Sequence, residues 1–158
     1  MPSQIPLETR HYPNDFVVHV TNLGTLAAAN VLLWYFDRDV VLDEVMLTLP
    51  DNISNANPGI NVKLLKLSNG GLPNFGTPVA GQTDVTSAFN LLTGATYPLQ
   101  VTWDKLVQGD VTQGFVATDS TERGNIIKAG SYLWLCASAA ATGVTGPASI
   151  LLRWRSQF

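Results

Sequence analysis

The side chains that could carry acid–base or metal chemistry are few and widely spaced in this chain. His11 and His19 have no third ligand at a spacing typical of zinc sites, so we expect them to be solvated or hydrogen-bonded. Residues 37–39 (Asp-Arg-Asp) lack the twelve-residue calcium-loop pattern and predict a hairpin turn with internal ion pairing. Asp43 and Glu44 are predicted to point to opposite faces of one strand. They are therefore not expected to act as the paired carboxylates of a glycosidase.

Cysteine and tryptophan offer two further kinds of site. Cys136 is the single cysteine, and in the run YLWLCASA it alternates with Tyr132 and Trp134. This pattern predicts a small buried hydrophobic side chain rather than a nucleophile. The tryptophans could form a sugar-stacking platform, but each lies inside a strand-like run, which favours core packing. They are Trp34, Trp103, Trp134 and Trp154.

No nucleophile-elbow, Walker or dinucleotide-binding motif occurs in the sequence, and the run Asn-Gly-Gly at residues 69–71 is a turn signal. We therefore expect no catalytic residues, no bound cofactor and no metal. The expectation is that this chain is not an enzyme.

The composition points to association rather than to nucleic acid or membrane. Charged residues make up 13% of the 158 residues, against about 25% in typical domains. A surface of neutral polar groups loses its water more easily than a charged one, so burial against another subunit is expected. A net charge of −3 argues against a nucleic-acid partner. No apolar run is long enough to span a bilayer, and no signal pattern begins the chain, so we expect it to be made and kept in a cytoplasm.

The chain divides into an extended arm and one folded unit. Residues 1–15 contain Pro2, Pro6 and Pro13 among polar neighbours and predict an extended N-terminal arm without a packing period. Residues 16–158 predict a single domain of antiparallel strands joined by loops rich in Gly, Pro and Asn, which is typical of a β-sandwich or barrel. The predicted strands cover residues 16–21, 26–36, 40–49, 60–67, 97–103, 114–118, 130–139 and 148–155. Residues 83–92 predict one short helix, because Val85, Ala88, Phe89 and Leu92 fall at helical spacing.

The second half of the chain resembles a known group of folds. The run IIKAGSYLWLCASAAATGVTGPASILLRWRSQF, in which residues 128–130 open a strand, resembles the final hairpin of jelly-roll proteins found on bacteriophage particles. The runs VVLDEVMLTLP and INVKLLKLSNGG are similar to the middle strands of the same proteins. The fold class that follows is all-β, an antiparallel β-sandwich of jelly-roll type with an extended N-terminal arm.

The resemblance implies a capsid decoration or cement protein, a structural virion protein that commonly forms a homotrimer where capsomers meet. Its partners would be its own copies and the major capsid protein, and its location would be the capsid surface after synthesis in the host cytoplasm. The alternative is a receptor- or carbohydrate-binding fibre or spike domain, because a sandwich can serve either function.

Candidate interface residues lie at both ends of the chain. In the final strand, Ile150, Leu152 and Trp154 are predicted to face the core, while Arg153 and Arg155 face outward. The outward arginines would be either placed for acidic groups of a neighbouring subunit or simply solvated. Acidic residues early in the chain could pair with the late basic residues between subunits or within one chain. The full set of interface candidates is Ile5, Leu7, Arg10, His11, Tyr12, Arg153, Arg155 and Phe158.

Overall fold

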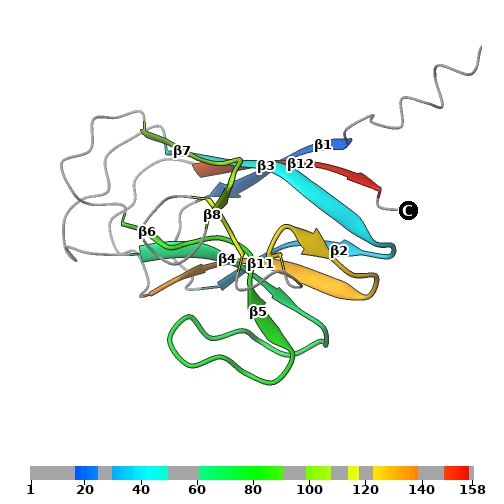
Figure 1. Cartoon of the computed structure of the whole chain (residues 1–158). Helices are drawn as coiled ribbons and strands as arrows, with labels where there is room; N and C mark the ends of the chain where they lie inside the picture. Colours follow the sequence, from blue (N-terminus) through cyan, green and yellow to red (C-terminus); the bar gives the residue numbers. More distant parts are fainter. Residues whose placement is uncertain are drawn as a thin grey trace, which may run out of the picture.

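Two antiparallel sheets packed face to face form the body of the molecule, shown as an upper and a lower layer in Figure 1. The structure is a computed structural model, and it describes residues 17–24, 30–49, 61–90, 99–107, 114–117, 123–138 and 148–156. Within these ranges every regular element is a strand. The expectation of an all-β antiparallel fold is therefore confirmed.

The first sheet has the strand order β1-β12-β3-β10, and β7 also pairs with β3. All of these pairings are antiparallel. Alternation of apolar and polar residues along β3 and β12 gives the sheet one core face and one outer face. The strands are β1 (Val17–Gly24), β3 (Val40–Leu49), β7 (Leu99–Trp103), β10 (Ile126–Ile127) and β12 (Ala148–Ser156).

The second sheet has the order β2-β11-β4-β5, and β6 also pairs with β4. Its pairings are antiparallel as well. The strands are β2 (Asn30–Phe36), β4 (Asn61–Leu67), β5 (Gln82–Asp84), β6 (Phe89–Asn90) and β11 (Ser131–Ala137). A short parallel pair is formed by β8 (Leu106–Val107) and β9 (Phe115–Val116).

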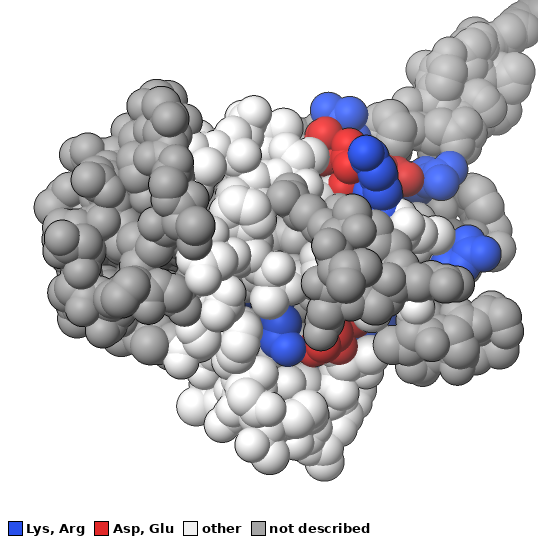
Figure 2. All heavy atoms as spheres, turned by 60° about the vertical axis from the view of Figure 1, so that its left-hand side comes forward, with Lys and Arg blue, Asp and Glu red and all other residues white. Residues whose placement is uncertain are grey.

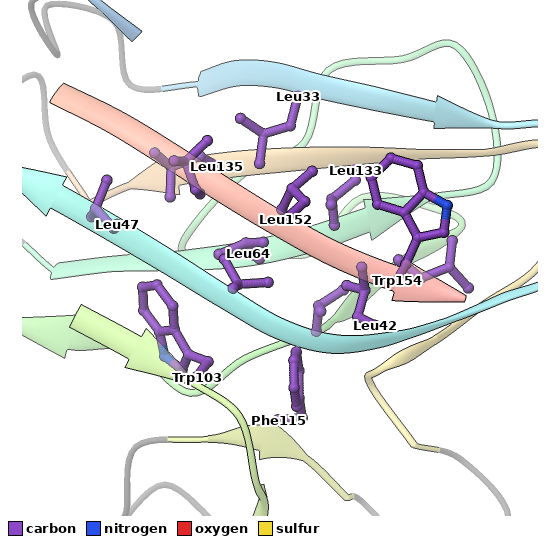
Figure 3. Close-up of a cluster of buried hydrophobic side chains, with 14 of the residues drawn as sticks. Leu33, Leu42, Leu47, Leu64, Trp103, Phe115, Leu133, Leu135, Leu152 and Trp154 are labelled. Carbon is purple, nitrogen blue, oxygen red and sulfur yellow. The ribbon is translucent and has the colours of Figure 1, made fainter. Parts of the chain in front are cut away.

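The main core fills the space between the sheets (Figure 3). As predicted for the final strand, Ile150, Leu152 and Trp154 are buried and belong to this core. Trp103 and Phe115 are also fully buried, and the Trp103 indole Nε1 donates a hydrogen bond to the Ser87 carbonyl at 3.2 Å. The other large contributions come from the inward side chains of β2, β3, β4 and β11, namely Leu33, Leu42, Leu47, Leu64, Leu133 and Leu135.

The predicted helix over residues 83–92 is wrong for the part that the structure describes. This part contains β5 and β6 instead, and residues 91–92 lie outside the described ranges. The Val85 N–H donates to the Leu64 carbonyl at 2.9 Å, and the Leu64 N–H donates to the Thr86 hydroxyl at 2.9 Å. These hydrogen bonds to β4 determine the local conformation, although Val85 and Phe89 have the spacing of a helix.

The other strand predictions agree with the structure to within a few residues. The strand over residues 40–49 is confirmed with the same bounds, and the structure places strands within or across the remaining seven predicted segments. The predicted arm, residues 1–15, lies outside the described residues and stays a prediction.

Candidate functional site

A row of ion pairs crosses the outer face of the first sheet. Arg155 Nε lies 3.2 Å from Asp43 Oδ1, and Arg153 Nη2 lies 3.7 Å from Glu44 Oε1. Both arginines face outward, as predicted, and their side chains are less than half exposed. Because both partners belong to the same chain, the early acidic and late basic residues pair within one subunit here. A role of these arginines toward a neighbouring subunit stays a prediction.

A bulge in β3 brings the two acids together. Arg153 lies opposite Glu44 and Trp154 lies opposite Leu42, so Asp43 is the extra residue. The prediction that Asp43 and Glu44 point to opposite faces is therefore wrong. Both reach arginines that are two residues apart on the same face of β12.

Burial dominates the electrostatics of Asp43. Loss of water raises the pKa of its carboxyl above the ordinary value, although Arg155 and Arg153 act in the opposite direction. Asp43 Oδ2 is buried and accepts no hydrogen bond from the residues that the structure describes. The row is thus a set of ion pairs within one subunit, in which one oxygen of Asp43 accepts no hydrogen bond from the described residues.

The outer face of the second sheet is built differently. Tyr132, Trp134 and Cys136 of β11 lie opposite Leu67, Leu65 and Lys63 of β4. Residues directly opposite each other share a face, and this face is the reverse of the one that Leu133 and Leu135 present to the main core. The outer face of this sheet is therefore largely apolar. Three of its side chains are fully buried although they are not part of the main core: Leu65, Leu67 and Cys136.

The connection between β4 and β5, residues 68–81, forms the second layer of this apolar region. Asn30 Nδ2 donates to the carbonyl of Pro73 at 3.1 Å, and Lys63 Nζ lies 4.7 Å from the ring centroid of Phe75. Figure 1 shows this connection below the second sheet, on the side away from the first sheet. Burial raises the pKa of the Cys136 thiol to about 12. The prediction of a buried, hydrophobic cysteine is confirmed.

Strand β2 forms an exposed apolar edge of this sheet. Among the described residues it pairs with β11 alone, and its sequence, NVLLWYF, contains neither charge nor proline. Leu32 is 47% exposed and Tyr35 is 49% exposed. Leu72, next to Pro73, is 69% exposed. Figure 2 shows a face on which charged side chains gather in a few places and uncharged residues form much of the described surface.

A hollow of about 230 Å³ opens where β2 and β12 end at one side of the sandwich. Trp34, Phe36 and Trp154 line it with aromatic rings. The Trp34 and Trp154 ring centroids are 5.7 Å apart, and the rings of Phe36 and Trp154 meet edge to face at 5.2 Å. Its polar lining comes from Asp37, Arg38 and Ser156.

The tryptophans do not all pack in the core. Trp103 and Trp154 are buried, as predicted. Trp34 is 38% exposed and lines the hollow, so core packing is wrong for this residue. Trp134 is half-buried on the outer face of β11 and is not part of the main core, so core packing is wrong for this residue as well.

The remaining interface candidates lie outside the residues that the structure describes. They are Ile5, Leu7, Arg10, His11, Tyr12 and Phe158. Within the described ranges, no group of three or more His, Cys, Asp or Glu residues is placed to hold a metal ion. A search of the same ranges finds no helix with the length and hydropathy needed to cross a membrane.

Comparison of the chain with protein-family models, with curated proteins and with solved structures finds no match.

Proposed function

We propose that this chain is a structural virion protein that binds the outer surface of a bacteriophage capsid and stabilises it as a decoration or cement protein. It acts by adhesion and catalyses no reaction. Its partners are its own copies, assembled as a homotrimer, and the major capsid protein. The resemblance of the strand runs to phage jelly-roll proteins supports this proposal, and so does the low share of charged residues in the sequence.

A jelly-roll topology is part of the proposal, and the strand order supports it. The first strand lies beside the last, since β1 pairs with β12. Strands β1, β12, β3 and β7 are neighbours in one sheet, and β2, β11, β4 and β5 are neighbours in the other. Successive strands β1, β2, β3 and β4 thus alternate between the sheets, as in a sandwich of nested Greek keys.

The observation that carries the proposal is the exposed apolar edge formed by β2. Among the described residues β2 pairs with β11 alone, and a strand at the edge of a sheet that carries no lysine, proline or other charge is the kind that pairs with a strand of another chain. Here the same strand also exposes Leu32 and Tyr35, and such apolar patches are typical of interaction sites. An adhesive protein with a cyclic interface uses this kind of surface between its copies.

The oligomeric part of the proposal is tested by light scattering of the purified chain and two variants. We expect a trimer for the parent chain and dissociation for Leu32→Lys, which places a charge on the β2 surface. Leu106→Lys is the matched control, because Leu106 is a similarly exposed leucine (43%) on β8. A monomeric parent, or two variants that assemble alike, would contradict the assignment of β2.

The location is tested by immunogold electron microscopy, with antibodies raised against the purified chain and virions from the source of the sequence. Label over the capsid shell is the expected result. Label confined to fibres or tail tips would instead support the alternative, a receptor- or carbohydrate-binding fibre or spike domain. Virions without label would overturn the assignment to the virion.

A further inference from the structure

The hollow between the ends of β2 and β12 has the features of a ligand site. Trp34, whose side chain is the most accessible of its aromatic walls, is 38% exposed, whereas Phe36 and Trp154 are 3% and 7% exposed. Asp37 and Arg38 also line it, with side chains 71% and 67% exposed, so the hollow is open to solvent at this side. The hollow thus combines a partly exposed aromatic ring with one negatively and one positively charged side chain.

The aromatic wall is held in place before any ligand arrives. A bulge in β2, where Trp34 lies opposite Leu133 and Leu32 lies opposite Trp134, turns the Trp34 side chain toward the inner face of the sheet. There its ring contacts Trp154, which is itself fixed edge to face by Phe36. A preorganised ring loses little freedom on binding, which favours affinity for a weakly held ligand.

The polar lining supplies both acceptors and donors. Arg38 Nε donates to Asp37 Oδ1 at 3.1 Å. The guanidinium carries further N–H donors, and the carboxylate carries a second acceptor oxygen. The hydrogen bond from Arg38 lowers the pKa of the Asp37 carboxyl, so this acceptor stays ionised at neutral pH. Adjacent hydroxyl groups match such a pair, because each hydroxyl can donate to the carboxylate or accept from the guanidinium.

Size and charge narrow the ligand class. A volume of about 230 Å³ is below the range of about 300–1,000 Å³ typical of drug-sized ligands, which indicates one small ring. The opposite charges of Asp37 and Arg38 offer no net attraction for an anion, and the whole chain carries −3. A nucleotide would bring its phosphates beside Asp37, so it fits less well than a neutral ring.

We propose that this hollow binds one neutral pyranose ring of a saccharide, with an apolar C–H face of the sugar stacked on Trp34 and its hydroxyl groups bonded to Asp37 and Arg38. Stacking on an indole and bonding to a few placed polar groups is how concave sites fix both the position and the orientation of a small ligand. The inference is independent of the proposed self-association, since Trp34 lies on the other face of β2 from Leu32 and Tyr35.

Saturation-transfer NMR with a panel of neutral methyl pyranosides tests the proposal. The panel holds the glucoside, galactoside, mannoside and N-acetylglucosaminide, with an acidic sialoside for comparison. We expect at least one neutral member to bind and the sialoside to bind more weakly. Absence of binding by every neutral member, or binding by the sialoside alone, would overturn the proposal.

Matched variants locate the binding. Trp34→Ala is expected to weaken binding at least about tenfold, because the stacking surface is lost. Tyr35→Ala, the neighbouring substitution on the opposite face of β2, is expected to leave binding unchanged. If Trp34→Ala does not fold, the double variant Asp37→Asn with Arg38→Gln replaces it, since both side chains are largely exposed and their loss should not unfold the chain. Parent-like binding by this double variant, or by folded Trp34→Ala, would contradict the assignment.

Discussion

The outer faces of the two sheets differ in the kind of side chain that they carry and in whether a further layer covers them. On the first sheet, Asp43 and Glu44 pair with Arg155 and Arg153, so four outward side chains of β3 and β12 form ion pairs across the sheet surface. On the second sheet, the outward side chains of β4 and β11 are largely apolar, and residues 68–81 lie against that side. A charged outer face needs no cover, whereas an apolar one needs a second layer or a partner.

A bulge occurs in each sheet, and the two bulges turn side chains in opposite directions, outward in β3 and inward in β2. In β3 the bulge turns two acids outward, where two arginines meet them. In β2 the bulge keeps Leu33 in the core and turns Trp34 inward at the rim, where it lines the aromatic hollow. The same backbone irregularity therefore completes a structural ion-pair row in one sheet and forms a candidate binding site in the other.

The largest expected difference between the two faces is the slow chemical labelling of the Cys136 thiol, which lies beneath residues 68–81. Burial raises the pKa of Cys136 from 9.0 to about 12, so the thiolate fraction near pH 8 falls by about a thousandfold. We expect a thiol reagent such as a disulfide dye to label the native chain far more slowly than the chain in denaturant. Equal rates would show that the layer over β11 is open.

Leu65→Ala should have the next largest effect, a loss of about 2–5 kcal/mol in the free energy of unfolding, because it empties a fully buried site. Denaturant titration measures the change. Leu72→Ala is the control, since Leu72 is 69% exposed and its loss should change stability by less than about 0.5 kcal/mol. If Leu65→Ala resembled the control, the second layer would contribute no packing.

The ion pairs of the first sheet should contribute much less. A double-mutant cycle on Asp43→Asn and Arg155→Ala is expected to give a coupling free energy of about 0.2–1 kcal/mol, since the Arg155 side chain is 44% exposed. Denaturant titration of the parent, both single variants and the double variant supplies the four values. A coupling of several kcal/mol would mean that the row is far better shielded from water than its exposure indicates.

The smallest expected effect concerns the pH dependence of stability, to which Asp43 and Asp37 should contribute with opposite signs. Because the folded-state pKa of Asp43 is raised, its contribution to stability is fully present below the unfolded value and is lost as pH rises through the folded value. The pKa of Asp37 is lowered, so its contribution is present above the unfolded value and is lost as pH falls through the folded value.

Melting of Asp43→Asn and of Asp37→Asn over the acid range measures both signs. Relative to its variant, the parent should lose stability as pH rises from about 4 in the Asp43 comparison. In the Asp37 comparison the parent should gain stability over the same rise. Two slopes of the same sign would refute the burial of Asp43 as the dominant influence on its pKa.

The sequence by itself determined the fold class and the sides of the clearest strands. Residues 40–49 and the inward Ile150, Leu152 and Trp154 were predictable, because alternation along a strand decides which side chains leave water. The burial of Cys136 followed from the same pattern. These features depend on local periodicity, which the sequence carries directly.

Only the tertiary structure decided the features that depend on a neighbouring strand. The shared face of Asp43 and Glu44 and the inward turn of Trp34 come from bulges, and a bulge is defined by the register against a partner strand. The strand at residues 82–84 likewise replaced part of an expected helix because β4 offered it hydrogen bonds. Pairing partners lie tens of residues away in sequence, so local periodicity cannot determine the register between strands. For the same reason, the aromatic hollow could be found only from the structure, in which β2 and β12 lie close together.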